Sequence, residues 1–99
     1  MTRNASRVHR DPAAIARLEA LVAALPNGGR MELTLEDGSV LRGLVAARPM
    51  VQVFFDPSGE EGSNGVVRIE PLTDDPFEST APRDLWLDSI VGVRDLGPP

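Results

Sequence analysis

The sequence predicts a mainly β domain in which one N-terminal α-helix packs against a strongly bent antiparallel β-sheet. Apolar residues recur every three or four positions between residues 12 and 25, which is typical of an amphipathic helix. From residue 31 the apolar period changes to two, as in a strand with one buried face. A glycine inside the second predicted strand marks a point where the sheet can curl.

The predicted helix spans residues 12–25. Asp11 and Pro12 favour its start, because the aspartate can accept from unpaired N–H groups and the first helical position does not use the N–H that proline lacks. The segment Pro26-Asn27-Gly28-Gly29 favours its end. One face of this helix is apolar and is formed by Ile15, Leu18, Leu21, Val22 and Leu25.

A β-hairpin is predicted after the helix. Apolar side chains alternate with polar ones from Met31 to Glu36, and Asp37-Gly38 is a typical tight turn. The return strand begins at Ser39 and contains Gly43, which we expect to mark a bulge or a sharp bend.

The rest of the chain alternates between short strands and polar loops. Strands are predicted at 50–55, 66–70, 85–87 and 90–93, with exposed loops at 56–65 and 71–82 and a turn at Asp88-Ser89. Phe54 and Phe55 should point to opposite faces, so one of them is partly exposed. Trp86 lies either in the core or outside it, depending on the register of its strand.

At 99 residues the chain has room for one domain, which we expect over residues 11–96, with its sheet over 31–96. Residues 1–10 contain three arginines and the only histidine and are expected to form a flexible basic arm, and residues 97–99 a short tail. The chain has no cysteine, no signal-peptide core and no long apolar segment, so we expect a cytoplasmic protein that does not span a membrane.

The first hairpin and the last two strands resemble those of the Sm-like family. Leu33-Thr34-Leu35-Glu36-Asp37-Gly38, followed by Gly43 and Leu44-Val45, resembles its first motif, and the stretch from Leu85 to Val93 resembles its closing strand pair. The resemblance implies an Sm-like, SH3-like small barrel of about five strongly bent antiparallel strands, preceded by a helix. More narrowly, the chain is similar to a small family of proteobacterial proteins, seen in xanthomonads, that is described as a variant of this fold.

Membership of the Sm-like family would imply RNA binding by rings of subunits, through the loop after the second strand and the turn between the last two. This sequence departs from both motifs. Arg48-Pro49-Met50-Val51-Gln52 has no asparagine where the family commonly has an aspartate and then Met-Asn, and the last turn has Asp88-Ser89 in place of its basic residues. A carboxylate in such a turn lowers affinity for a polyanion.

The main hypothesis from the sequence is an interaction module that forms a homo-oligomer through its sheet edges. The expected contact residues are Val51, Val53, Ile90, Val91 and Val93. The alternative is an RNA-binding protein that uses an arginine rim made of Arg42, Arg48, Arg68 and Arg94, although the formal net charge of −5 disfavours binding to a polyanion.

An enzyme is not expected. Cysteine, lysine and tyrosine are absent, and His9 lies in the predicted arm. No catalytic constellation, metal-ligand spacing, cofactor motif or small-molecule site is evident in the sequence.

Overall fold

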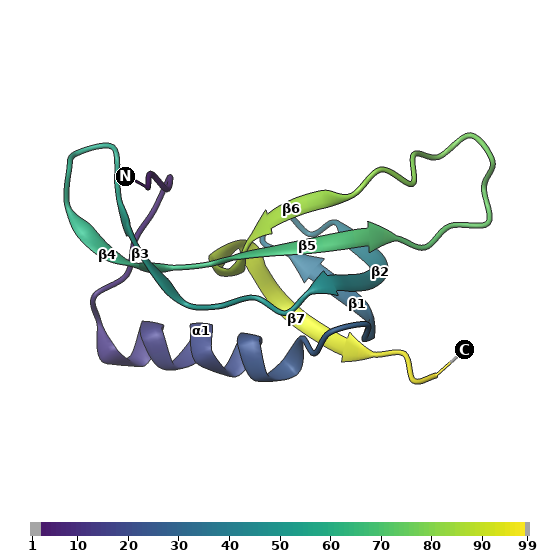
Figure 1. The fold of residues 1–99 in the computed structure, drawn as a ribbon, viewed down its shortest axis with the longest axis horizontal. Coiled ribbons are helices and arrows are strands. Elements are labelled where there is room, and N and C mark those ends of the chain that lie inside the picture. Colours follow the sequence, from purple (N-terminus) through teal and green to yellow (C-terminus); the bar gives the residue numbers. More distant parts are fainter. Residues whose placement is uncertain (1–2, 99) are drawn as a thin grey trace.

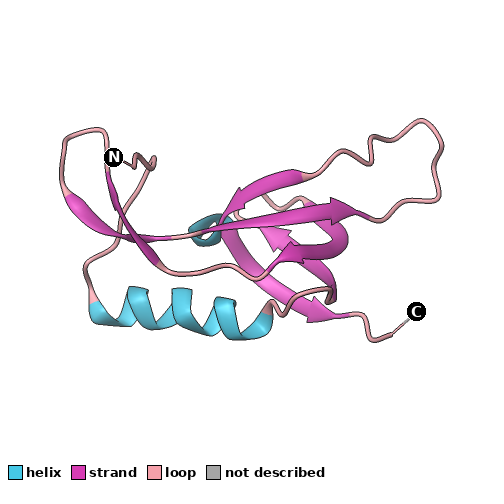
Figure 2. Cartoon of the chain, viewed as in Figure 1, coloured by secondary structure: helices cyan, strands magenta, loops and turns pink. Residues whose placement is uncertain are grey.

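The computed structural model describes residues 3–98, and it confirms the mainly β fold with one helix (Figures 1 and 2). The predictions for residues 1–2 and 99 lie outside the described residues. The helix is α1 (Pro12–Ala24). The strands are β1 (Arg30–Leu35), β2 (Val40–Ala47), β3 (Gln52–Phe55), β4 (Glu61–Asn64), β5 (Val66–Pro71), β6 (Arg83–Trp86) and β7 (Ile90–Asp95), with a 3₁₀ turn (Leu87–Ser89) between the last two.

Five strands form one antiparallel sheet in the order β6-β5-β2-β1-β7, and β3 and β4 form a separate pair. β2 pairs with β5 and β3 pairs with β4, so the two sheets are successive parts of one long hairpin. This hairpin is interrupted at residues 48–51 on one side and at Gly65 on the other. Figure 1 shows the β3–β4 end projecting away from the five-stranded sheet.

Gly43 lies inside β2 but is not where the pairing is interrupted. It pairs with Met31 on one side and with Pro71 on the other, and the register shift falls between Val45 and Ala47. The reason for glycine here is the close approach of β5: a Cβ at Gly43 would lie 2.3 Å from Cγ2 of Ile69. The close packing of β5 therefore excludes larger side chains from this position.

The helix begins and ends close to the predicted residues. Asp11 is the N-cap, and its carboxylate accepts from the Ala14 N–H at 3.3 Å, with Pro12 at the first helical position. The last cap bond runs from the N–H of Leu25 to the carbonyl of Val22. Leu18 and Leu25 are buried, so the predicted apolar face is the one that packs.

The core lies between α1 and the inner face of the five-stranded sheet. Met31, Leu33 and Leu35 are all buried, which confirms the predicted alternation along β1. The buried set is completed by Leu18, Leu25, Val45, Val67, Ile69, Leu85, Leu87 and Ile90. Phe54 is buried and Phe55 is half-buried, as expected for neighbours on a strand. Trp86 is also half-buried and packs edge-to-face on Phe54, with 5.3 Å between the ring centroids.

The predicted loop at 56–65 contains a strand that its composition does not indicate. Residues 61–64 form β4, because β3 supplies a complete set of backbone partners for them. Only residues 56–60 remain as the loop, where the Asp56 carboxylate accepts from the N–H groups of Ser58 and Glu60, both at 2.9 Å. The loop between β5 and β6 stays irregular and projects from the sheet (Figure 1).

Residues 3–10, which the sequence predicts as a flexible arm, form a strap across the β3–β4 hairpin. Ala5 donates to the Phe55 carbonyl at 2.9 Å, and the Phe55 N–H donates to the Arg3 carbonyl at 2.8 Å. His9 and Ser63 exchange two backbone hydrogen bonds of 2.9 and 2.7 Å. The strap therefore pairs with the outer edges of both strands, a long-range contact that local composition does not reveal. Among residues 3–98 no helix is long and apolar enough to cross a membrane.

Candidate functional site

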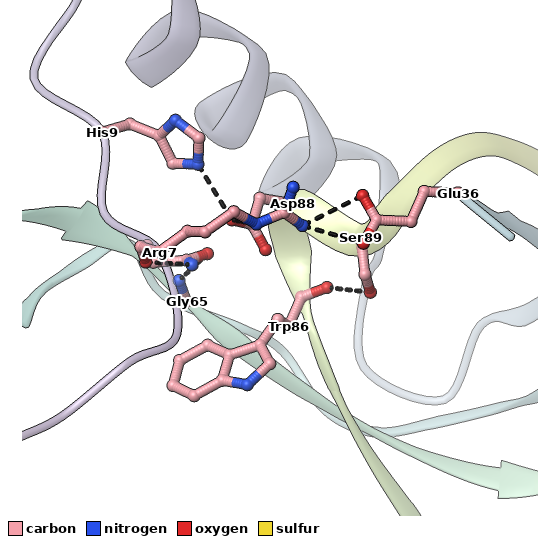
Figure 3. A network of polar contacts seen from close by, with 8 residues as sticks. Arg7, His9, Glu36, Gly65, Trp86, Asp88 and Ser89 are labelled. Carbon is pink, nitrogen blue, oxygen red and sulfur yellow. Dashed lines mark hydrogen bonds and ion pairs between the residues drawn. The ribbon is translucent and has the colours of Figure 1, made fainter. Parts of the chain in front are cut away.

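The strap places the Arg7 guanidinium and the His9 imidazole next to Asp88, which lies in the 3₁₀ turn between β6 and β7 (Figure 3). Oδ2 of Asp88 lies 2.9 Å from Nε2 of His9 and 3.2 Å from Nε of Arg7. The Asp88 side chain is only 6% exposed. Its other oxygen, Oδ1, is buried and has no hydrogen-bond partner among the described residues.

Arg7 links three elements of the fold through this site. Its guanidinium donates to both carboxylate oxygens of Glu36, at 2.9 and 3.0 Å, and its carbonyl accepts from the side-chain amide of Asn64 at 2.9 Å. The pKa of Arg7 is raised, first by the hydrogen bond with Glu36 and then by the charge of Asp88. Asn64 is fully buried, and its Oδ1 accepts from the N–H of Gly65 at 2.9 Å.

This arrangement occupies the turn in which the Sm-like resemblance implies a nucleotide contact. The Asp88 carboxylate faces inward and is engaged by the chain's own Arg7 and His9. From the sequence, Arg7 was expected only as part of an auxiliary RNA-binding arm with Arg3 and Arg10, and His9 was not expected in any site. The spacing of two between Ala5, Arg7 and His9 puts them on one face of an extended segment, and that period is the signal in the sequence that could have indicated a strand-like strap.

The four arginines of the predicted rim do not form one free basic surface. Arg42 and Arg94 converge on Glu32 across β2, β1 and β7, with the shortest N–O distances at 2.7 and 2.9 Å. Arg68 pairs with Asp84 at 3.0 Å. Arg48 follows the end of β2, where its backbone N–H donates to the side-chain oxygen of Asn27. Three of the four guanidinium groups are therefore partnered by carboxylates.

The pKa of Glu32 lies below its ordinary value of 4.5, because Arg94 and then Arg42 donate hydrogen bonds to its carboxylate. A carboxyl group whose pKa is lowered by folding stabilises the fold above its unfolded pKa and loses that contribution as the pH falls through its folded pKa. We expect the free energy of unfolding to decrease as the pH is lowered below about 4.5. Glu32→Gln should make this dependence of stability on pH less steep.

Urea denaturation at several pH values measures this effect. Glu19→Gln on the exposed side of α1 is the control, since Glu19 makes no ion pair among the described residues. A Glu32→Gln profile that parallels the wild-type profile from pH 6 to pH 3 would contradict the assignment.

The residues predicted to mediate self-association do not form one continuous surface. Ile90 is buried, and Val51 packs against the core. Val53 lies on the β3–β4 hairpin, whereas Val91 and Val93 lie on β7. Val91 is 65% exposed and stands beside a groove of about 560 Å³ between α1 and β7. Most of its lining is aliphatic and includes Leu18, Leu21, Ile90 and Val93, and His9, Arg17 and Asp88 also line it.

Within residues 3–98 no three histidine, aspartate or glutamate side chains are grouped so that they could hold a metal ion. No curated protein matches the chain. A solved structure that it resembles is that of XC5848 from Xanthomonas campestris, described as adopting a novel variant of the Sm-like motif. The two are 38% identical, the match covers 98% of this chain and 100% of that one, and the TM-score is 0.88.

The model of the family described as domain of unknown function (DUF3247) matches residues 2–96. The match therefore covers the strap, α1 and all seven strands, and it agrees with the variant Sm-like fold of the solved neighbour. The chain belongs to this family.

Proposed function

We propose that this domain is a non-catalytic interaction module that self-associates through β6 and β7. Each of these strands pairs on one side only among the described residues, because they end the five-stranded sheet. The strap, in contrast, bonds to the outer edges of β3 and β4. Unpaired strand edges offer rows of backbone donors and acceptors to another chain.

The observation that carries the proposal is the exposed apolar surface next to the free edge of β7. Val91 stands out from the strand, and the groove beside it is lined mainly by aliphatic side chains from α1 and β7. A strand from a second copy that added to β7 would pair its backbone and cover these side chains together. If β6 of one copy pairs with β7 of the next, the contact is head-to-tail and can close into a ring.

Val91→Arg should disrupt this contact, because it places a charge where an apolar surface would be buried. We expect wild-type protein to scatter light as a particle larger than 10.6 kDa at micromolar concentration, and the variant to require at least tenfold more protein to reach that mass. Val40→Arg is the matched control, since Val40 is 58% exposed but lies on β2. A wild-type mass of 10.6 kDa up to 100 micromolar would contradict the proposal.

The arginine-rim alternative has less support than self-association. The carboxylates of Glu32 and Asp84 neutralise Arg42, Arg94 and Arg68, and phosphate groups would have to displace those carboxylates. RNA binding stays a prediction of the sequence resemblance.

A further inference from the structure

We propose that the surface beneath the strap is a binding site for extended basic peptides, and that residues 3–10 are its built-in occupant. This surface, the strap site, consists of the outer edges of β3 and β4, the Asn64 amide, and the carboxylates of Glu36, Glu60 and Asp88. Its backbone contacts lie on β3 and β4 and not on the β6 and β7 edges that carry the proposed self-association, although His9 and Asp88 also line the groove beside Val91.

The backbone of the strap is held as an added strand is held. Asn4 forms a parallel bridge with Phe55, and His9 forms an antiparallel bridge with Ser63, so the strap crosses from one edge of the hairpin to the other. Between these bridges the Asn64 amide donates to the Arg7 carbonyl. All of these bonds involve the main chain of the occupant, and any extended peptide could make them.

The charges of the strap site select a basic occupant. Arg7 faces Glu36 and Asp88, His9 faces Asp88, and Arg10 lies 3.0 Å from Glu60. Three carboxylates therefore face three basic side chains of an eight-residue segment. An acidic or neutral peptide would leave the buried Asp88 carboxylate without a partner, which is costly.

The shape of the site also fits a crossing chain. A Cβ at Gly62 would lie 2.8 Å from Cγ2 of Val8, so glycine gives the occupant room to pass over β4. Beneath the strap, the buried Oδ1 of Asp88 accepts no hydrogen bond from any residue between 3 and 98. A guanidinium in the place of His9 could donate to both oxygens of this carboxylate, whereas the imidazole engages only Oδ2.

A competing peptide can displace the strap because several of its contacts are weak. The Arg7–Glu36 and Arg10–Glu60 pairs are about half or more exposed at both partners, and exposed ion pairs contribute little and are screened by salt. A peptide that carries arginine at the His9 position should therefore compete with the chain's own segment.

The test uses a fluorescent peptide with the sequence of residues 3–10 carrying His9→Arg. In the full-length chain, Arg7→Ala with His9→Ala weakens the strap but leaves the strap site intact. We expect this double variant to bind the peptide at least tenfold more tightly than the wild type does. Adding Asp88→Asn should lower that affinity at least tenfold, and Asp84→Asn, in an exposed pair on β6, should not. A folded double variant that does not bind, or that binds equally well with Asp88→Asn, would overturn the proposal.

If the double variant does not fold, the wild-type chain decides the question by amide hydrogen exchange with the same peptide in millimolar excess. Displacement of the strap predicts faster exchange at Ala5 and His9, while Ser63 stays protected because the peptide replaces its partner. Unchanged exchange at Ala5 and His9 under these conditions would overturn the proposal. Light scattering in parallel reports self-association, so the two proposals can fail independently.

Discussion

Gly43→Ala is expected to destabilise the fold by about 3 kcal/mol, at the upper end of the cost of overfilling a packed core. The added Cβ would lie 2.3 Å from Cγ2 of Ile69 and 2.7 Å from the carbonyl oxygen of Glu70. The Ile69 side chain is fully buried and the Glu70 oxygen is backbone, so neither can move aside without disturbing the pairing of β2 with β5. The free energy of unfolding from urea titration measures the change.

Gly92→Ala is the matched control within the same sheet. A Cβ at Gly92 would lie 3.5 Å from Cβ of Thr34, which is an ordinary van der Waals contact. We expect this change to alter stability by less than about 0.5 kcal/mol, as substitutions away from special features commonly do. Equal stabilities for the two variants would show that β5 does not approach Gly43 as closely as described.

Asn64→Leu is expected to cost about 3 kcal/mol, because it leaves the buried Gly65 N–H and the part-buried Arg7 carbonyl without their partners. Asn64 is fully buried and connects the Gly65 N–H to the Arg7 carbonyl, each at 2.9 Å. Leucine fills a similar volume but offers neither a donor nor an acceptor. Amide hydrogen exchange at His9 and Ser63 should also be faster in this variant, since the strap loses a central contact.

Asn4→Leu tests whether this effect is specific. Asn4 lies on the strap but is exposed, and its side chain makes no hydrogen bond among the described residues. Its replacement should change the free energy of unfolding by less than about 0.5 kcal/mol. If Asn4→Leu destabilised the chain as much as Asn64→Leu, the cost would not come from the buried amide.

The main elements of the fold could be predicted because local signals agree with tertiary contacts. Asp11 and Pro12 indicate the helix start, and the alternation along β1 matches its burial. The resemblance in the first hairpin and the closing strands correctly indicated the Sm-like fold. Strand β4 could not be predicted in this way, because Glu61 to Asn64 are polar and become a strand only through pairing with β3.

The candidate site was harder to predict than the fold because it depends on contacts between distant segments. Asp88 and Ser89 were identified as a departure from the family's turn, but His9 lies 79 positions away from Asp88 in the chain. The rim arginines were identified as charges, and only the cross-strand register places Glu32 between Arg42 and Arg94. The charged residues can be read from the sequence, whereas the pairing of the strands decides which of them are neutralised.

The position of β1 in the sheet has a consequence for synthesis on the ribosome. β1 lies between β2, its neighbour in sequence, and β7, which pairs Arg94 with Glu32 across more than sixty residues of chain. The sheet therefore cannot be completed until the last strand has left the exit tunnel. Until then the nascent chain has no partner for one edge of β1. The apolar side chains around Leu33 stay partly exposed during this time, because Val93 is not yet in place to pack against them.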